Sequence, residues 1–194
     1  QLSMTFDGQE ATIDYTVWSD VMICPHCGRE FIFWDVAVFR NEKRMLEKFR
    51  CPGCGAELTK KSSIVAKETV FDSIQNKTVS IPKQIPVLIR YTTQDGKHWE
   101  KKPDEDDLKV IEKINSLTIP YWYPTDAVKK GDKTQEAINK GITSVDFFFQ
   151  KRNLYALSLI WANASNEMKF IITAFILRAV SYTHLRAHET LSDL

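Results

Sequence analysis

The four cysteines are the residues whose type and spacing most directly specify chemistry. Cys24, Cys27, Cys51 and Cys54 form two Cys-x-x-Cys pairs, and no cysteine is left over. Two intervening residues let one tight turn aim both sulfurs at a single ion, and the 23 residues from 28 to 50 can form a hairpin that brings the pairs together. Zinc accepts four thiolates in a tetrahedron at about 2.3 Å, which leaves no position for water or substrate. The sequence therefore predicts a structural zinc ribbon.

Both turns follow one five-residue pattern, at 24–28 and 51–55, with proline after the first cysteine and glycine after the second. A glycine there tolerates the positive φ that lets backbone amides point at the sulfurs. Iron is the alternative metal, because rubredoxin-type sites use paired turns of the same kind and the ligands alone do not separate the two. His26 lies inside the first turn, and we expect it to be exposed.

Composition limits the remaining classes of function. The chain of 194 residues is 43% hydrophobic with a formal net charge of +1, typical of a globular protein without a global basic field. Paired cysteines without a signal peptide indicate a reducing, cytoplasmic compartment. The apolar run at 168–180 is too short for a membrane span, which needs roughly 20 residues.

Motifs for catalysis are missing from the sequence. It has no glycine-rich phosphate loop, no dinucleotide fingerprint and no Gly-x-Ser-x-Gly elbow. Two of its four histidines, His184 and His188, lie in the last residues. The carboxylates at 104–107 suit the first turn of a helix. We therefore expect no complete active site in this chain.

The pattern of apolar residues predicts an α+β fold. Short antiparallel strands form the ribbon, with strands expected at 31–38 and 45–50, after a first strand at 11–18. Further hairpins are expected around the turns at 73–77 and 95–96, and prolines 82, 86 and 103 favour edge strands. Helices are predicted at 103–115, near 135–139, at 147–164 and at 167–180.

Five segments follow from this pattern. Residues 1–19 lead from a parent domain into the ribbon at 20–61, which a mixed hairpin and helix region follows at 62–125. Residues 126–180 hold a loop and helices that join the parent catalytic domain, and 181–194 is interpreted as a non-native tail. Because the sequence opens on Gln1, we expect a fragment.

Several short motifs occur in a characteristic order: 15–21 (YTVWSDV), the first cysteine pair, 33–38 (FWDVAV), the second pair, 84–89 (QIPVLI), 100–104 (EKKPD), 119–126 (IPYWYPTD), 141–143 (GIT) and 151–154 (KRNL). Together they resemble a family of large prokaryotic site-specific DNA methyltransferases that methylate adenine. In that family a zinc-ribbon insert lies between the cofactor-binding motif and an Asp-Pro-Pro-Tyr-type catalytic motif. Residues 144–146 depart from its pattern, because they replace a segment that is often rich in histidine.

The resemblance implies a parent enzyme that uses S-adenosylmethionine, with duplex DNA as its partner and the catalytic domain elsewhere in the same chain. Such enzymes flip the target base out of the duplex. Cations at a predicted hairpin tip, Arg40, Lys43 and Arg44, and at a helix start, Lys151 and Arg152, are the candidate DNA contacts. The aromatic residues at 121–123 could stack on a base or pack under a core. The alternative is a non-enzymatic zinc-ribbon module for interaction or scaffolding.

Overall fold

The computed structural model describes residues 3–6, 9–39, 44–72, 77–132, 134–139 and 141–183. These residues form two compact units. The first holds the described residues within 1–68 and 82–108, and the second holds those within 69–81 and 109–183. The fold combines antiparallel strands with C-terminal helices, as predicted.

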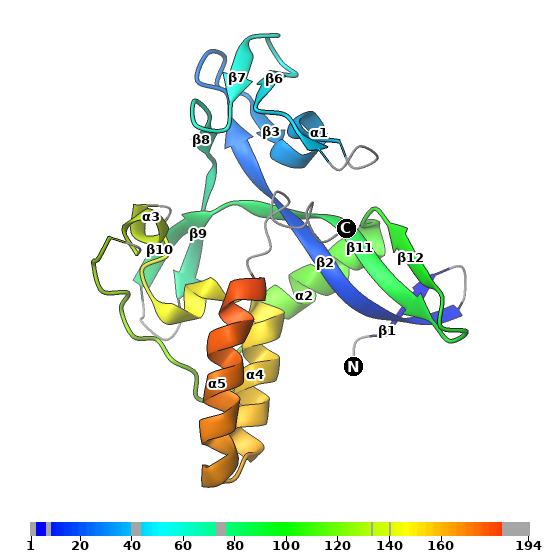
Figure 1. The fold of residues 1–194 in the computed structure, drawn as a ribbon, viewed down its shortest axis with the longest axis vertical. Coiled ribbons are helices and arrows are strands. Elements are labelled where there is room, and N and C mark those ends of the chain that lie inside the picture. The colour runs from blue at the N-terminus through cyan, green and yellow to red at the C-terminus, as the bar shows by residue number, and fades with distance from the viewer. Residues whose placement is uncertain are drawn as a thin grey trace. The chain divides into compact units, whose positions relative to one another are not determined.

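A central antiparallel sheet organises the first unit. The strands along its main path are β1 (Ser3–Phe6), β2 (Gln9–Ile23), β11 (Gln84–Thr93) and β12 (His98–Lys101), in the order β1-β2-β11-β12 (Figure 1), and two short strands described below also pair with β2. The predicted strand at 11–18 lies inside the longer β2. The Asp95-Gly96 hairpin is confirmed, because Gly96 has a φ of 79° and joins β11 to β12.

The expectation of an edge strand around Pro86 is wrong for β11, which pairs with β2 on one side and β12 on the other. Proline is tolerated because β12 pairs only with Ile89–Thr92, so it does not reach Pro86. The register with β2 also shifts between Pro86 and Leu88, in a bulge where a missing amide donor costs little.

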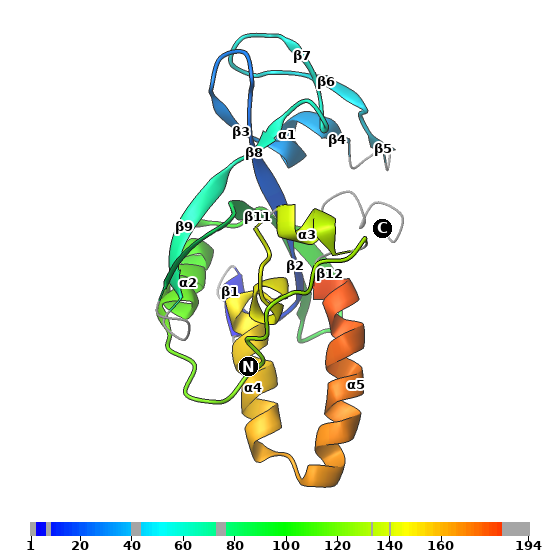
Figure 2. The same ribbon diagram turned by 90° about the vertical axis from the view of Figure 1, so that its left-hand side faces the viewer.

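The ribbon follows β2 and consists of short elements: β3 (Glu30–Ile32), α1 (Phe33–Ala37), β4 (Val38–Phe39), β5 (Arg44–Met45), β6 (Lys48–Arg50), β7 (Glu57–Thr59) and β8 (Ile64–Val65) (Figure 2). The strand predicted at 31–38 is wrong in its centre, where α1 forms a helical turn. The turn buries Phe33, Trp34 and Ala37 together, at a spacing that a strand would split between two faces.

The ribbon is joined to the sheet at the far end of β2. Met22 pairs with Phe31 of β3 on one side and with Val65 of β8 on the other. Three backbone hydrogen bonds then close a ring: Val21 N donates to Lys83 O, Lys83 N to Ala66 O, and Ala66 N to Val21 O, at 3.0, 2.8 and 2.9 Å. Ala66 is fully buried in this junction.

A further contact fixes α1 against the central sheet. Trp34 packs with Val17, Val87 and Leu88, and its backbone amide donates to Ser19 Oγ at 3.0 Å. The ribbon is therefore held to the sheet by both backbone and side-chain contacts.

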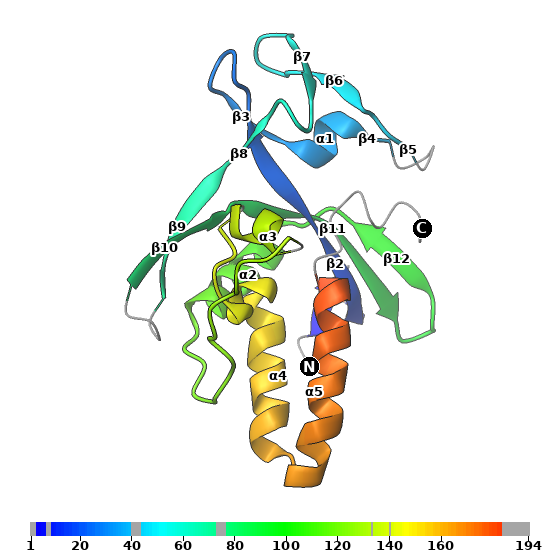
Figure 3. The same cartoon turned by 60° about the vertical axis from the view of Figure 1, so that its left-hand side comes forward.

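The second unit is largely helical. The hairpin of β9 (Lys67–Asp72) and β10 (Lys77–Pro82) leads into it, and α2 (Glu105–Ser116) begins in the first unit and continues into it. The helices α3 (Gln135–Asn139), α4 (Lys151–Asn163) and α5 (Asn166–Thr183) follow, with a 3₁₀ turn at Val145–Phe148 before α4. Figure 3 shows α4 and α5 side by side as a hairpin.

The predicted helix at 147–164 therefore begins later, at Lys151, because its first residues form the 3₁₀ turn. The last helix continues three residues into the segment interpreted as a tail, and residues 184–194 lie outside the described part of the chain. No helix among the described residues is long and apolar enough to cross a membrane.

Candidate metal centre

The two cysteine turns have the same backbone geometry. In the first, Cys24 N donates to Arg29 O and Gly28 N donates to Cys24 O, at 3.0 and 2.9 Å. In the second, Cys51 N donates to Ala56 O and Gly55 N donates to Cys51 O, both at 2.9 Å. Gly28 and Gly55 adopt φ values of 72° and 73°, a region where a Cβ is strained, so both positions favour glycine.

The four sulfurs converge on one point. Cys24 Sγ lies 3.8 Å from Cys54 Sγ, Cys27 Sγ lies 3.7 Å from Cys51 Sγ, and all four lie within 4.8 Å of one another. A tetrahedral ion with bonds of about 2.3 Å separates its ligands by about 3.8 Å, so the cluster fits a four-thiolate zinc site. Among the described residues, no other group of three or more metal-ligating side chains comes together in this way.

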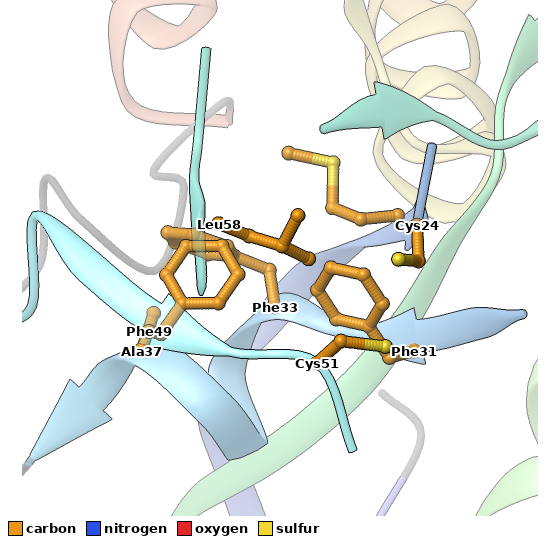
Figure 4. Packing of buried hydrophobic residues seen from close by; sticks show 8 residues of the cluster. Cys24, Phe31, Phe33, Ala37, Phe49, Cys51 and Leu58 are labelled. Carbon is orange, nitrogen blue, oxygen red and sulfur yellow. The ribbon is translucent and has the colours of Figure 1, made fainter. Parts of the chain in front are cut away.

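The sulfurs are also part of a hydrophobic core. Cys24 and Cys51 are buried, whereas Cys27 and Cys54 are exposed. The buried pair lies at one end of a cluster formed by Met22, Phe31, Phe33, Ala37, Phe49 and Leu58 (Figure 4). The Phe49 ring meets Phe31 and Phe33 edge to face, at centroid distances of 5.9 and 5.6 Å. Metal ligation and apolar packing therefore stabilise the same few residues.

Backbone amides favour a thiolate at Cys51. Hydrogen bonds from the Cys54 amide and from the Gly53 amide, whose nitrogen lies 3.3 Å from the sulfur, lower the pKa of Cys51 to about 6. The Ala56 amide lowers the pKa of Cys54, but desolvation and hydrogen bonds with the other three thiols outweigh it and raise that pKa to about 11. Without an ion the cluster resists a second negative charge, and a cation removes that repulsion.

Arg29 is a residue of the site that the sequence did not single out. A Cβ added to Gly53 would lie 2.8 Å from Arg29 Cδ and 3.2 Å from its Cζ, so the arginine side chain crosses the second turn where glycine leaves room. This places a cation beside the turn whose amides point at Cys51. The only sequence signal is the difference between the two turns, which carry His26 and Gly53 at equivalent positions.

The candidate DNA contacts are spread over both units. Arg44 is exposed on β5, which pairs with β4, while Arg40 and Lys43 lie outside the described residues. Lys151 and Arg152 occupy the first turn of α4, whose N-cap, Gln150, makes no side-chain capping bond. Lys151 is half-buried and Arg152 is exposed. His26 is exposed, as expected.

The carboxylates before α2 form a capping box. Asp107 N donates to Asp104 Oδ1 at 2.9 Å, and Asp104 N donates to Asp107 Oδ2 at 3.0 Å. Lys101 Nζ lies 2.8 Å from a carboxylate oxygen of each aspartate. The hydrogen bond from Lys101, followed by that from the Asp107 amide, lowers the pKa of Asp104 to about 2. These contacts explain the acidic run by helix capping, as the sequence predicted.

Comparison of the chain with protein families, with curated proteins and with solved structures finds no match. The geometry of the four sulfurs is therefore the basis for assigning a possible zinc-binding module.

Proposed function

We propose that this chain is a part of a site-specific, adenine-type DNA methyltransferase that carries a structural zinc ribbon and helps to hold duplex DNA. The catalytic and S-adenosylmethionine motifs belong to other parts of the parent enzyme. Support comes from the order of the short motifs along residues 15–154 and from the clustered sulfurs of the two cysteine pairs.

The sulfur cluster is the observation that supports the structural zinc ribbon in this proposal. Four thiolates complete the coordination of zinc, so the ion supplies folding energy rather than a reactive water. Two of the sulfurs are buried in the small aromatic core of the ribbon. The ribbon at 20–61 is close to the size of about 40 residues below which domains usually depend on metals or disulfides, so we expect the ion to supply much of its stability.

The cations between and beside β4 and β5 are the proposed DNA contacts. Arg44 is exposed at the start of β5, and Arg40 and Lys43, which lie outside the described residues, fall between the two strands in the sequence. Each cation that neutralises a phosphate releases condensed counterions and adds about 0.9 to the slope of log affinity against log salt. Three such contacts therefore contribute about 2.7 to that slope.

The test measures duplex binding by the zinc-loaded chain with fluorescence anisotropy between 50 and 200 mM salt. The tip variant combines Arg40→Glu, Lys43→Glu and Arg44→Glu. Its control has the same net charge and combines Lys67→Glu, Lys102→Glu and Lys113→Glu at exposed positions. We expect the slope of log affinity against log salt to fall by about 2.7 in the tip variant and to stay unchanged in the control.

Equal effects of the two variants would refute a specific tip contact. Absence of duplex binding at low salt would favour the alternative, a zinc-stapled interaction or scaffold module. Elemental analysis of the purified chain separates zinc from iron and is expected to give one zinc per chain.

A further inference from the structure

The aromatic loop of the second unit divides into packed and exposed residues. Tyr121 and Tyr123 are half-buried and pack against the cluster of Ile119, Phe149 and Leu154. Trp122, between the two tyrosines, is 62% exposed. The loop therefore holds an indole in solvent on an anchored backbone, although tryptophan is usually among the more buried residues.

The ring of Trp161 on α4 packs against the exposed indole of Trp122. The two ring centroids lie 5.4 Å apart with planes inclined by 37°. Tyr121 meets Tyr155 of the same helix edge to face at 6.2 Å, which fixes the loop along α4. Because both contacts hold the loop, Trp122 loses little conformational entropy when a planar ligand stacks on it.

A positive charge lies beside the Trp161 ring. Lys169 of α5 places its Nζ 5.9 Å from the centroid of the Trp161 ring. Glu167 lies two residues earlier, roughly 200° around the helix, and therefore points away from Lys169. By the same periodicity Arg152 lies about half a turn away from Trp161 on α4, so it belongs to another face.

An exposed indole that packs on a second indole, which itself has a cation beside it, matches a ligand that is both planar and anionic. Nucleobases stack on aromatic rings, and the adjacent phosphates attract the lysine. We propose that Trp122, supported by Trp161 and Lys169, stacks an unpaired base of single-stranded DNA. This inference rests on the proposed function, because an enzyme that flips its target base leaves unstacked nucleotides to be held.

The charge beside the Trp161 ring favours this ligand over an apolar protein segment. Among the side chains of α5 that the structure describes, Phe170 is the most exposed apolar one, at 81%, and it lies about 100° around the helix from Lys169. A purely hydrophobic partner would cover Phe170 and its neighbour Ile171, and it would gain nothing from Lys169.

The experiment measures binding of the zinc-loaded full chain to a labelled oligothymidine by anisotropy, beside duplex binding in the same buffer. Trp122→Ala is compared with Trp122→Phe, which keeps a ring, and with Trp99→Ala, which removes another exposed tryptophan from the first unit. We expect Trp122→Ala to weaken oligothymidine binding by about 5- to 150-fold, the range for loss of one stacked base. Trp122→Phe and Trp99→Ala should stay within about threefold of the parent chain.

A second measurement uses an abasic oligonucleotide of the same length, which keeps the phosphates and lacks the bases. We expect it to bind equally to the parent chain and to Trp122→Ala, while Lys169→Ala lowers its salt slope by about 0.7. Lys169→Ala therefore tests the same surface if Trp122→Ala fails to fold.

Unchanged oligothymidine binding in Trp122→Ala, with normal duplex binding, would overturn the stacking inference and leave the proposed function intact. Sedimentation of the same variants serves as a further readout: if the parent chain self-associates and Trp122→Ala loses this association while its oligothymidine binding is unchanged, the surface belongs to a second copy of the chain and the inference is overturned. Absence of binding to either form of DNA would refute the proposed function together with this inference.

Discussion

Removal of zinc by a chelator is expected to unfold the ribbon while the central sheet stays folded. A structural zinc site contributes about 10–16 kcal/mol of apparent binding energy, which is comparable with the whole stability of a typical domain. In this chain that energy acts on the cluster of Cys24 and Cys51 with six apolar neighbours. The β2–β11 ladder, in contrast, has nine paired positions and contains no metal ligand.

Amide hydrogen exchange distinguishes these two regions. The amides of Cys24, Cys51 and Gly55 donate to carbonyls within the cysteine turns, so their protection reports on the ribbon. We expect their protection to fall by at least about a thousandfold on chelation, since that factor needs only about 4 kcal/mol of the zinc contribution. Amides of β11 that pair with β2 should change by less than about tenfold.

Re-addition of zinc is the matched control and should restore the protection of the cysteine turns, whereas magnesium should not. Turn amides that keep their protection after complete metal removal would show that the ribbon folds without the ion. Equal loss in β11 would also contradict the prediction, because the sheet would then depend on the ion.

Three further predictions concern single positions. Gly141→Ala should destabilise the second unit by at least about 2 kcal/mol in thermal unfolding, because Gly141 has a φ of 96° and a Cβ there would lie 2.5 Å from a backbone oxygen of β10; an unchanged melting temperature would contradict this. Asp104→Asn should cost less than about 1 kcal/mol at neutral pH, since the side chain of Asp104 is 56% exposed. The pKa of Asp104 is lowered by Lys101 to about 2, so its stabilising contribution is present above pH 4 and is lost as pH falls through 2, below which denaturant curves of the two proteins should converge. In the zinc-loaded chain, Cys27 and Cys54 should be alkylated before the two buried cysteines, and mass spectrometry that finds all four equally reactive would contradict this.

The cysteine spacing alone predicted the metal cluster, because two turns of the same five-residue pattern leave few ways to arrange four sulfurs. The Asp95-Gly96 hairpin and the capped helix α2 were also predictable, since both depend on residues close in sequence. Local patterns of this kind express the conformational preferences of a few neighbouring residues, so they survive without knowledge of the tertiary fold.

Long-range packing decided the features that the sequence did not predict. Residues 33–37 have strand-like composition, but burial of Phe33, Trp34 and Ala37 between two cores selects a helical turn. Pairing of β8 with Met22 joins segments about forty residues apart, which no local pattern specifies. Trp122 is exposed whereas its two tyrosine neighbours are half-buried, and this difference likewise depends on which rings of the loop pack against α4.

The junction at the end of β2 shows how such a ribbon can be gained or lost during evolution. Met22 and Val65 are antiparallel partners, so the chain leaves and re-enters the sheet at points about 5 Å apart. A turn of two residues could span that gap and convert β2 and β8 into a simple hairpin. The hydrogen-bonded ring of Val21, Ala66 and Lys83 would keep its donors and acceptors after such a deletion. In its topology the ribbon is thus an insertion between β2 and β8, and its removal would leave the strands connected while taking Trp34 out of the core beside Val17.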